Sequence, residues 1–91
     1  MQIKWTTRAL SDLARLYEFL APVNKAAAAK TVQSLTAAPS RLLAHPRLGE
    51  LLEQFSPQEV RRILVGQYEI RYTVQGETIF ILRLWHTREA R

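Results

Sequence analysis

The stretch Gln67–His86, QYEIRYTVQGETIFILRLWH, decides the fold, because two strand patterns follow one another around a turn. Apolar and polar residues alternate strictly from Gln67 to Val74, and a period of two places every second side chain on the same face of a strand. The pair Gln75-Gly76 predicts a two-residue hairpin turn, because glycine readily adopts the positive φ that such turns need. Residues 79–85 are apolar on both faces, which predicts a central strand. The stretch therefore predicts an antiparallel strand pair.

The first half of the chain contains two helical patterns. Thr6 or Thr7 offers an N-cap to the first helix, and Pro22 ends it because the proline ring prevents continuation. Apolar residues recur at three- and four-residue spacing between them, and the stripe predicted to face inward is Leu10, Leu13, Tyr17 and Leu20. The charged residues predicted on the opposite side are Arg8, Asp12, Arg15 and Glu18. Asn24 predicts the N-cap of a second helix, with Ala28, Val32 and Leu35 facing inward.

Two further strands complete the expected order of elements. Residues 60–65 predict a strand that turns at Gly66 into the alternating segment, and Ile3–Trp5 predicts a brief edge strand. The predicted order is β-α-α-β-β-β in a single domain over residues 1–91. We expect an α+β fold in which an antiparallel helical hairpin packs on one face of an antiparallel sheet.

The composition indicates a basic intracellular protein with an acidic partner. The chain has 91 residues and a net charge of +5, and ten of its 13 cationic side chains are arginines, which favour bidentate contacts with carboxylate or phosphate. Nucleic acid and an acidic protein segment both remain open as partners, and so does a charge that only maintains solubility. There is no cysteine, no signal-peptide pattern and no apolar run long enough for a membrane span. We therefore expect a cytoplasmic protein that has no membrane association.

Few residues could perform chemistry. The two histidines, His45 and His86, are isolated in the sequence, and no glycine-rich phosphate loop or metal-binding pattern exists, so neither a cofactor nor a metal is expected. His45 lies in a predicted loop, whereas His86 leaves the last strand directly into a basic end. Arg83 interrupts that apolar strand, so we expect it either to pair with a carboxylate, such as Glu69 or Glu77, or to line a site for an anionic partner.

Four segments together resemble one known family. They are Trp5-Thr6 ahead of Asp12-Leu13 and Tyr17, then LAHPRLG (43–49), RILVGQYEIRY (62–72) and IFILRLWH (79–86) followed by a basic end. Their order and spacing resemble the ParE toxins of the RelE/ParE superfamily over nearly the whole chain. The resemblance implies a type II toxin held in a hetero-oligomer by a ParD-type antitoxin, which has a ribbon-helix-helix DNA-binding part. The residues expected to contact the antitoxin are Leu13, Leu16, Tyr17 and Leu20.

The resemblance leaves two activities open. ParE-like toxins are described as inhibitors of DNA gyrase, and RelE-like toxins are ribosome-dependent mRNA endoribonucleases. RelE-type toxins carry a basic residue where this chain has Glu69, which favours gyrase inhibition without catalysis. The candidate target-binding residues are Arg71, Arg83, His86, Arg88 and Arg91, and a nuclease would be built from His86, Arg83 and Arg88. A third reading is a non-toxic domain that binds nucleic acid or another partner.

The binding interpretation depends on one structural condition. It requires a free face on the helical hairpin and sheet, and it would fail if His45, His86 and several arginines met in one pocket.

Overall fold

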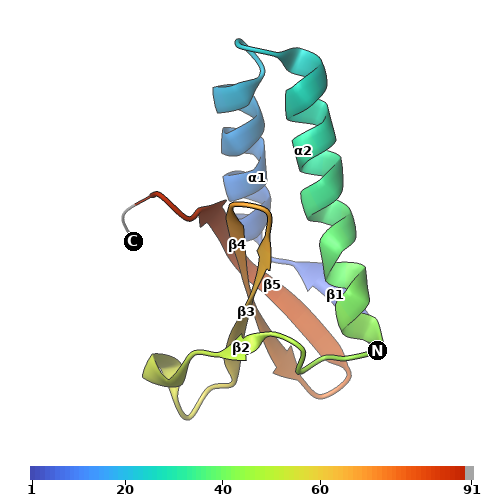
Figure 1. Cartoon of the computed structure of the whole chain (residues 1–91). Helices are drawn as coiled ribbons and strands as arrows, with labels where there is room; N and C mark the ends of the chain where they lie inside the picture. The colour runs from blue at the N-terminus through green and yellow to red at the C-terminus, as the bar shows by residue number, and fades with distance from the viewer. Residues whose placement is uncertain (90–91) are drawn as a thin grey trace.

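The computed structural model describes residues 1–89 and contains two helices and a five-stranded sheet (Figure 1). The elements, in chain order, are β1 (Gln2–Trp5), α1 (Thr7–Leu20), α2 (Lys25–Ala37), the 3₁₀ helix η1 (Ala38–Leu43), β2 (Glu50–Leu51), the 3₁₀ helix η2 (Glu53–Phe55), β3 (Val60–Val65), β4 (Tyr68–Gln75) and β5 (Thr78–His86). The predicted α+β fold and its β-α-α-β-β-β order are confirmed. The short strand β2 is an addition that the sequence did not indicate.

The sheet has the strand order β1-β5-β4-β3-β2. Strands β3, β4 and β5 pair antiparallel as predicted, and the additional strand β2 pairs antiparallel with β3. Strand β1 pairs parallel with β5, so the sheet is mixed and the expectation of a wholly antiparallel sheet was wrong. The expected hairpin turn is shifted by one residue, because Gln75 pairs with Thr78 and leaves Gly76 and Glu77 in the turn. Gly76 has a φ of 58°, which is the left-handed conformation that the turn requires.

The junction between β1 and α1 is attached to β5 through Thr6. The Thr6 hydroxyl accepts a hydrogen bond from the Ala9 amide at 3.1 Å and donates one to the Leu82 carbonyl at 3.1 Å. The Thr6 amide donates to the Ile81 carbonyl. The predicted cap therefore performs two tasks, because it starts the helix and also fixes its first turn against the sheet.

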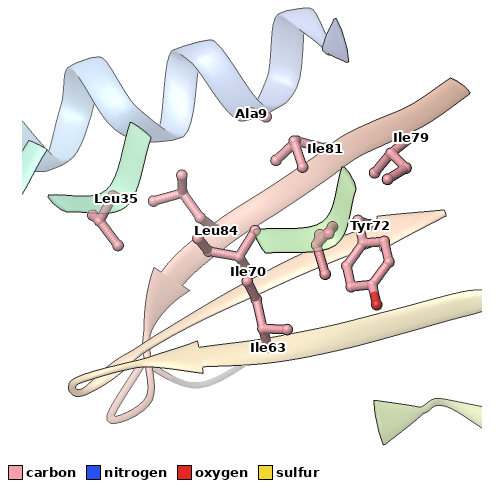
Figure 2. Packing of buried hydrophobic residues seen from close by; sticks show 9 residues of the cluster. Ala9, Leu35, Ile63, Ile70, Tyr72, Ile79, Ile81 and Leu84 are labelled. Atoms are coloured by element: carbon pink, nitrogen blue, oxygen red, sulfur yellow. The ribbon is translucent and has the colours of Figure 1, made fainter. Parts of the chain in front are cut away.

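The core lies between the helices and one face of the sheet (Figure 2). Its buried cluster consists of Ala9, Leu35, Leu42, Ile63, Ile70, Tyr72, Ile79, Ile81 and Leu84. On α1 the inward side differs from the predicted stripe, because Ala9 and Asp12 are buried while Leu10 is exposed. The prediction was wrong at Asp12 because an aspartate was assumed to face solvent, whereas this one has partners on β5.

Tyr72 fastens the loop that precedes β2. Its hydroxyl donates to the Pro46 carbonyl at 2.8 Å and accepts from the Gly49 amide at 2.9 Å. Gly49 itself leaves no room for a larger residue, because an added Cβ would lie 2.5 Å from the Arg62 carbonyl oxygen and 2.7 Å from the Tyr72 hydroxyl. The loop is therefore held by packing as well as by hydrogen bonds.

The helical hairpin extends beyond the sheet. Figure 1 shows the connection between α1 and α2 standing clear of the strands, while the C-terminal end of β5 approaches the middle of α1. Neither of these helices, nor any other helix within residues 1–89, has the length and apolar character needed to span a bilayer.

Candidate partner-binding groove

The edge of β5 changes partner halfway along the strand. Strand β1 pairs with residues 78–81 of β5 and then ends, so the following residues of β5 face α1 instead. There the Leu84 amide donates to Asp12 Oδ2 at 3.0 Å. The Asp12 carboxylate thus accepts the hydrogen bond that a neighbouring strand would accept if β1 were longer, and it fixes α1 against the edge of β5. Asp12 is only 4% exposed, so this contact is buried.

Two arginines compensate the buried Asp12 carboxylate. Arg83 donates from Nε to Oδ2 at 2.8 Å and from Nη2 to Oδ1 at 3.1 Å, and Arg15 donates from Nη2 to Oδ1 at 2.6 Å. Burial alone would raise the pKa of Asp12, but hydrogen bonds from Arg83 and the Leu84 amide, together with the charges of both arginines, lower it overall. The expectation that a carboxylate within the fold neutralises Arg83 is therefore confirmed, but that carboxylate is Asp12, and neither Glu69 nor Glu77.

A groove of about 660 Å³ opens beside this ion pair, between the second half of α1 and the end of β5. Its walls are mainly apolar, and Phe19 contributes a side chain that is 69% exposed. The lining residues are Asp12, Arg15, Leu16, Phe19, Leu20, Tyr68, Leu84, Trp85, His86, Arg88 and Glu89. An exposed aromatic ring beside an open apolar groove is typical of a surface that a partner covers.

The turn after β5 is folded back on His86. The His86 amide donates to Glu89 Oε1 at 3.0 Å, and His86 Nδ1 accepts from the Arg88 amide at 3.1 Å. The His86 ring also meets Tyr68 edge to face, with ring centroids 5.2 Å apart. One ring nitrogen of His86 is thus occupied by the backbone, and Arg88 is an exposed residue of the groove lining.

The face of the sheet away from the helices holds a row of paired arginines. Arg62, Arg71 and Arg83 are direct neighbours across β3, β4 and β5. Glu69, which is 5% exposed, accepts from Arg62 Nη1 at 3.0 Å and from Arg71 Nε at 2.8 Å. The Arg71 guanidinium also lies 4.5 Å from the ring centroid of Trp85 and 5.4 Å from that of Phe55. Both Arg71 and Arg83 are therefore engaged within the fold.

Only some of the residues predicted to contact the antitoxin, and only some of those predicted to contact the target, line the groove. Of the antitoxin candidates, Leu16 and Leu20 line it, whereas Leu13 packs against the core and Tyr17 is not among the lining residues. Of the target and nuclease candidates, the lining includes His86 and Arg88 but neither Arg71 nor Arg83. Arg91 lies outside the described residues.

His45 lies apart from the groove, because it is exposed in its loop and is not among the lining residues. Sequence reasoning missed Phe19, Tyr68 and Trp85, and only Phe19 had a readable signal, since it lies three residues after Leu16 on the same helix. Within residues 1–89 no three histidine, aspartate or glutamate side chains gather as they would to hold a metal ion.

Comparisons with known proteins agree with this architecture. The model of the family described as "ParE toxin of type II toxin-antitoxin system, parDE" matches residues 3–91. A curated relative, Toxin RelE2 of Caulobacter vibrioides, is 31% identical over 85 residues, which cover 93% of each chain. A solved structure titled "Chromosomal ParDE TA system from P. aeruginosa" superposes with a TM-score of 0.80 at 26% identity, covering 94% of this chain and 95% of that one. On these grounds the chain belongs to the ParE family of toxins of type II toxin–antitoxin systems.

Proposed function

We propose that this ParE-family toxin acts by binding DNA gyrase, and that a ParD-type antitoxin with a ribbon-helix-helix DNA-binding part neutralises it by occupying the groove. The antitoxin proposal is supported by the similar structure, whose title describes a ParDE system. We take the antitoxin to be encoded beside the toxin.

The observation that carries the proposal is the exposed apolar wall of the groove. Phe19 stands 69% exposed next to Leu16 and Leu20, and the facing wall is formed by Leu84 and Trp85. Burying an aromatic or leucine side chain contributes about 1.5–3 kcal/mol. An amphipathic segment with two or three apolar anchors would therefore gain enough free energy to bind here.

The same groove suggests how neutralisation works. Leu16 and Leu20, which are antitoxin candidates, share it with His86 and Arg88, which are target candidates. A segment that fills the groove would cover both sets at once. In this account the antitoxin blocks the target by direct occlusion.

The ion pairs that hold Arg71 and Arg83 within the fold favour a binding function over RNA cleavage. Arg83 is held by Asp12 and Arg71 by Glu69, so neither is available to a phosphate unless its present ion pair breaks. Glu69 also places a buried anion on the face that carries the arginine row. Phosphate binding would be opposed by that charge.

A supercoiling assay with purified gyrase tests the proposed target. We expect the toxin to inhibit supercoiling of relaxed plasmid at micromolar concentration, and an equimolar amount of the antitoxin to restore it. The toxin added to a topoisomerase that does not supercoil serves as the control and should leave that enzyme active. Full supercoiling at every toxin concentration would exclude gyrase as the target.

A ribosome-dependent ribonuclease is the second candidate. It is favoured by the meeting of His86 and Arg88 in one groove beside Tyr68, and by the name of the relative Toxin RelE2. His86 would be its acid–base group. Messages cleaved only in the presence of ribosomes, and left intact by His86→Ala, would replace the gyrase proposal with this one.

A further inference from the structure

The turn that follows β5 is closed by hydrogen bonds although residues 87–89 are exposed. The Thr87 amide donates to the Gln67 carbonyl at 2.8 Å. The Glu89 amide donates to the His86 carbonyl at 2.9 Å, and the His86 amide donates to Glu89 Oε1 at 3.0 Å. The Arg88 amide, in contrast, donates to a ring nitrogen, His86 Nδ1, at 3.1 Å. The path of the chain at Arg88 therefore depends on the His86 ring.

The His86 ring is itself supported by β4. Tyr68 is the residue opposite His86 across the two strands, and the two rings meet edge to face with their centroids 5.2 Å apart. Aromatic pairs favour this arrangement, so the contact orients the imidazole. A ring that the fold already orients loses little further freedom when it accepts the Arg88 amide.

The contact with the Arg88 amide requires an uncharged His86 ring. A nitrogen that accepts a hydrogen bond carries no proton, so the proton of the neutral ring is on Nε2. A second proton would bind Nδ1, where it would face the Arg88 N–H and replace an acceptor by a donor. The other titratable or charged groups of the described groove lining are Asp12 and Arg15 from α1, Tyr68 from β4, and Arg88 and Glu89 from the turn. The turn should therefore loosen when the ring gains a proton at low pH.

We infer that His86 is a positioning residue, whose neutral ring accepts the Arg88 amide and thereby holds Arg88 in place for the target. This inference rests on the proposed function, in which Arg88 is a candidate target-binding residue. An exposed arginine whose backbone is held loses less conformational freedom on binding than one on a loose turn. The role assigned to His86 is that of a hydrogen-bond acceptor, which differs from the acid–base role that a ribonuclease would need.

Two substitutions of His86 separate positioning from chemistry. Asparagine can also accept the amide of the residue two positions on, as in an Asx turn, but it does not gain a proton as histidine does. We expect His86→Ala to lower the protection factor of the Arg88 amide in NMR hydrogen exchange about fivefold, the effect of one side-chain hydrogen bond. The toxin concentration for half-inhibition of gyrase should rise by about the same factor. His86→Asn should recover most of both losses.

The matched control is His45→Ala, which removes the other histidine from an exposed loop position outside the groove lining. It should change neither the protection of the Arg88 amide nor the inhibition of gyrase. The NMR spectrum of each variant also shows whether the chain is folded, so a lost turn is distinguished from a lost fold.

The pH dependence of the same amide provides a second arm. In the wild type the protection factor of the Arg88 amide should fall about fivefold as the pH falls through the titration of the His86 ring, which NMR follows on the ring protons. In His86→Asn the protection factor should stay constant over the same range. A constant value in the wild type would overturn the inference.

Two further results would also overturn it. One is equal protection of the Arg88 amide in the wild type and His86→Ala, because the ring would then not hold the turn. The other is a His86→Asn variant that restores this protection but inhibits gyrase no better than His86→Ala, because the imidazole itself would then be needed. If the wild-type toxin does not inhibit gyrase, the proposed function fails, and the exchange of the Arg88 amide still decides whether His86 holds the turn.

Discussion

Asp12→Ala should lower the free energy of unfolding by about 3–4 kcal/mol, because removal of one member of a buried ion pair leaves the other charge uncompensated. The variant would leave the Arg83 guanidinium and the Leu84 amide without the partner that both use in the native fold. Urea denaturation of the purified toxin measures this change. Glu18→Ala removes an exposed acid from the same helix and should change stability by less than about 0.5 kcal/mol. Equal effects from the two substitutions would contradict the assigned role of Asp12.

The pH dependence of stability provides a second check on Asp12. Its pKa in the folded protein lies below the ordinary carboxyl value of 3.8, so the folded state binds this proton less readily than the unfolded chain. The stabilisation is therefore fully present above pH 3.8 and is lost as the pH falls through the folded-state pKa. In Asp12→Asn this part of the acid dependence should disappear, and an unchanged profile would show that other carboxylates cause it.

Gly49→Ala should lower the free energy of unfolding by about 3 kcal/mol through steric overlap. The new Cβ would lie 2.5 Å from the Arg62 carbonyl oxygen and 2.7 Å from the Tyr72 hydroxyl, and neither is the free end of a flexible side chain. The loop would have to move away from β3 and β4. Denaturant unfolding of the variant measures the loss.

Gly66→Ala separates this packing effect from backbone strain. Gly66 has a φ of 60° and open space around a built Cβ, so alanine there should cost about 1 kcal/mol through conformation alone. Gly49 has no positive φ. If Gly66→Ala were the more damaging of the two, the close approach at Gly49 would not be the reason for glycine there.

The strands and helix starts could be predicted because their signals are local. The alternation from Gln67 to Val74 gave β4, and Thr6 and Asn24 do accept the hydrogen bonds expected of N-caps. The parallel pairing of β1 could not be predicted, because a strand of four residues carries too little pattern to fix its partner or direction.

The candidate site depended on contacts between distant parts of the chain. Asp12 and Arg83 are 71 residues apart, and nothing near Asp12 in the sequence marks it as buried. The groove exists because β5 continues past the end of β1 and its edge there faces α1, which is a consequence of the assembled sheet. For this reason the sequence predicted Leu16 and Leu20 in one set of candidates and His86 and Arg88 in another, with no indication that they share a groove, and Tyr68 and Trp85 were missed.

The central claim is that a partner docks in the groove beside Phe19, and the affinity of the antitoxin for Phe19→Ala tests it most directly. We predict about a 30-fold weaker complex, the effect of losing about 2 kcal/mol from a central aromatic contact. Leu10→Ala, which alters another exposed apolar residue of α1 outside the groove lining, should bind like the wild type. Unchanged affinity in Phe19→Ala, or an equal loss in Leu10→Ala, would contradict the account.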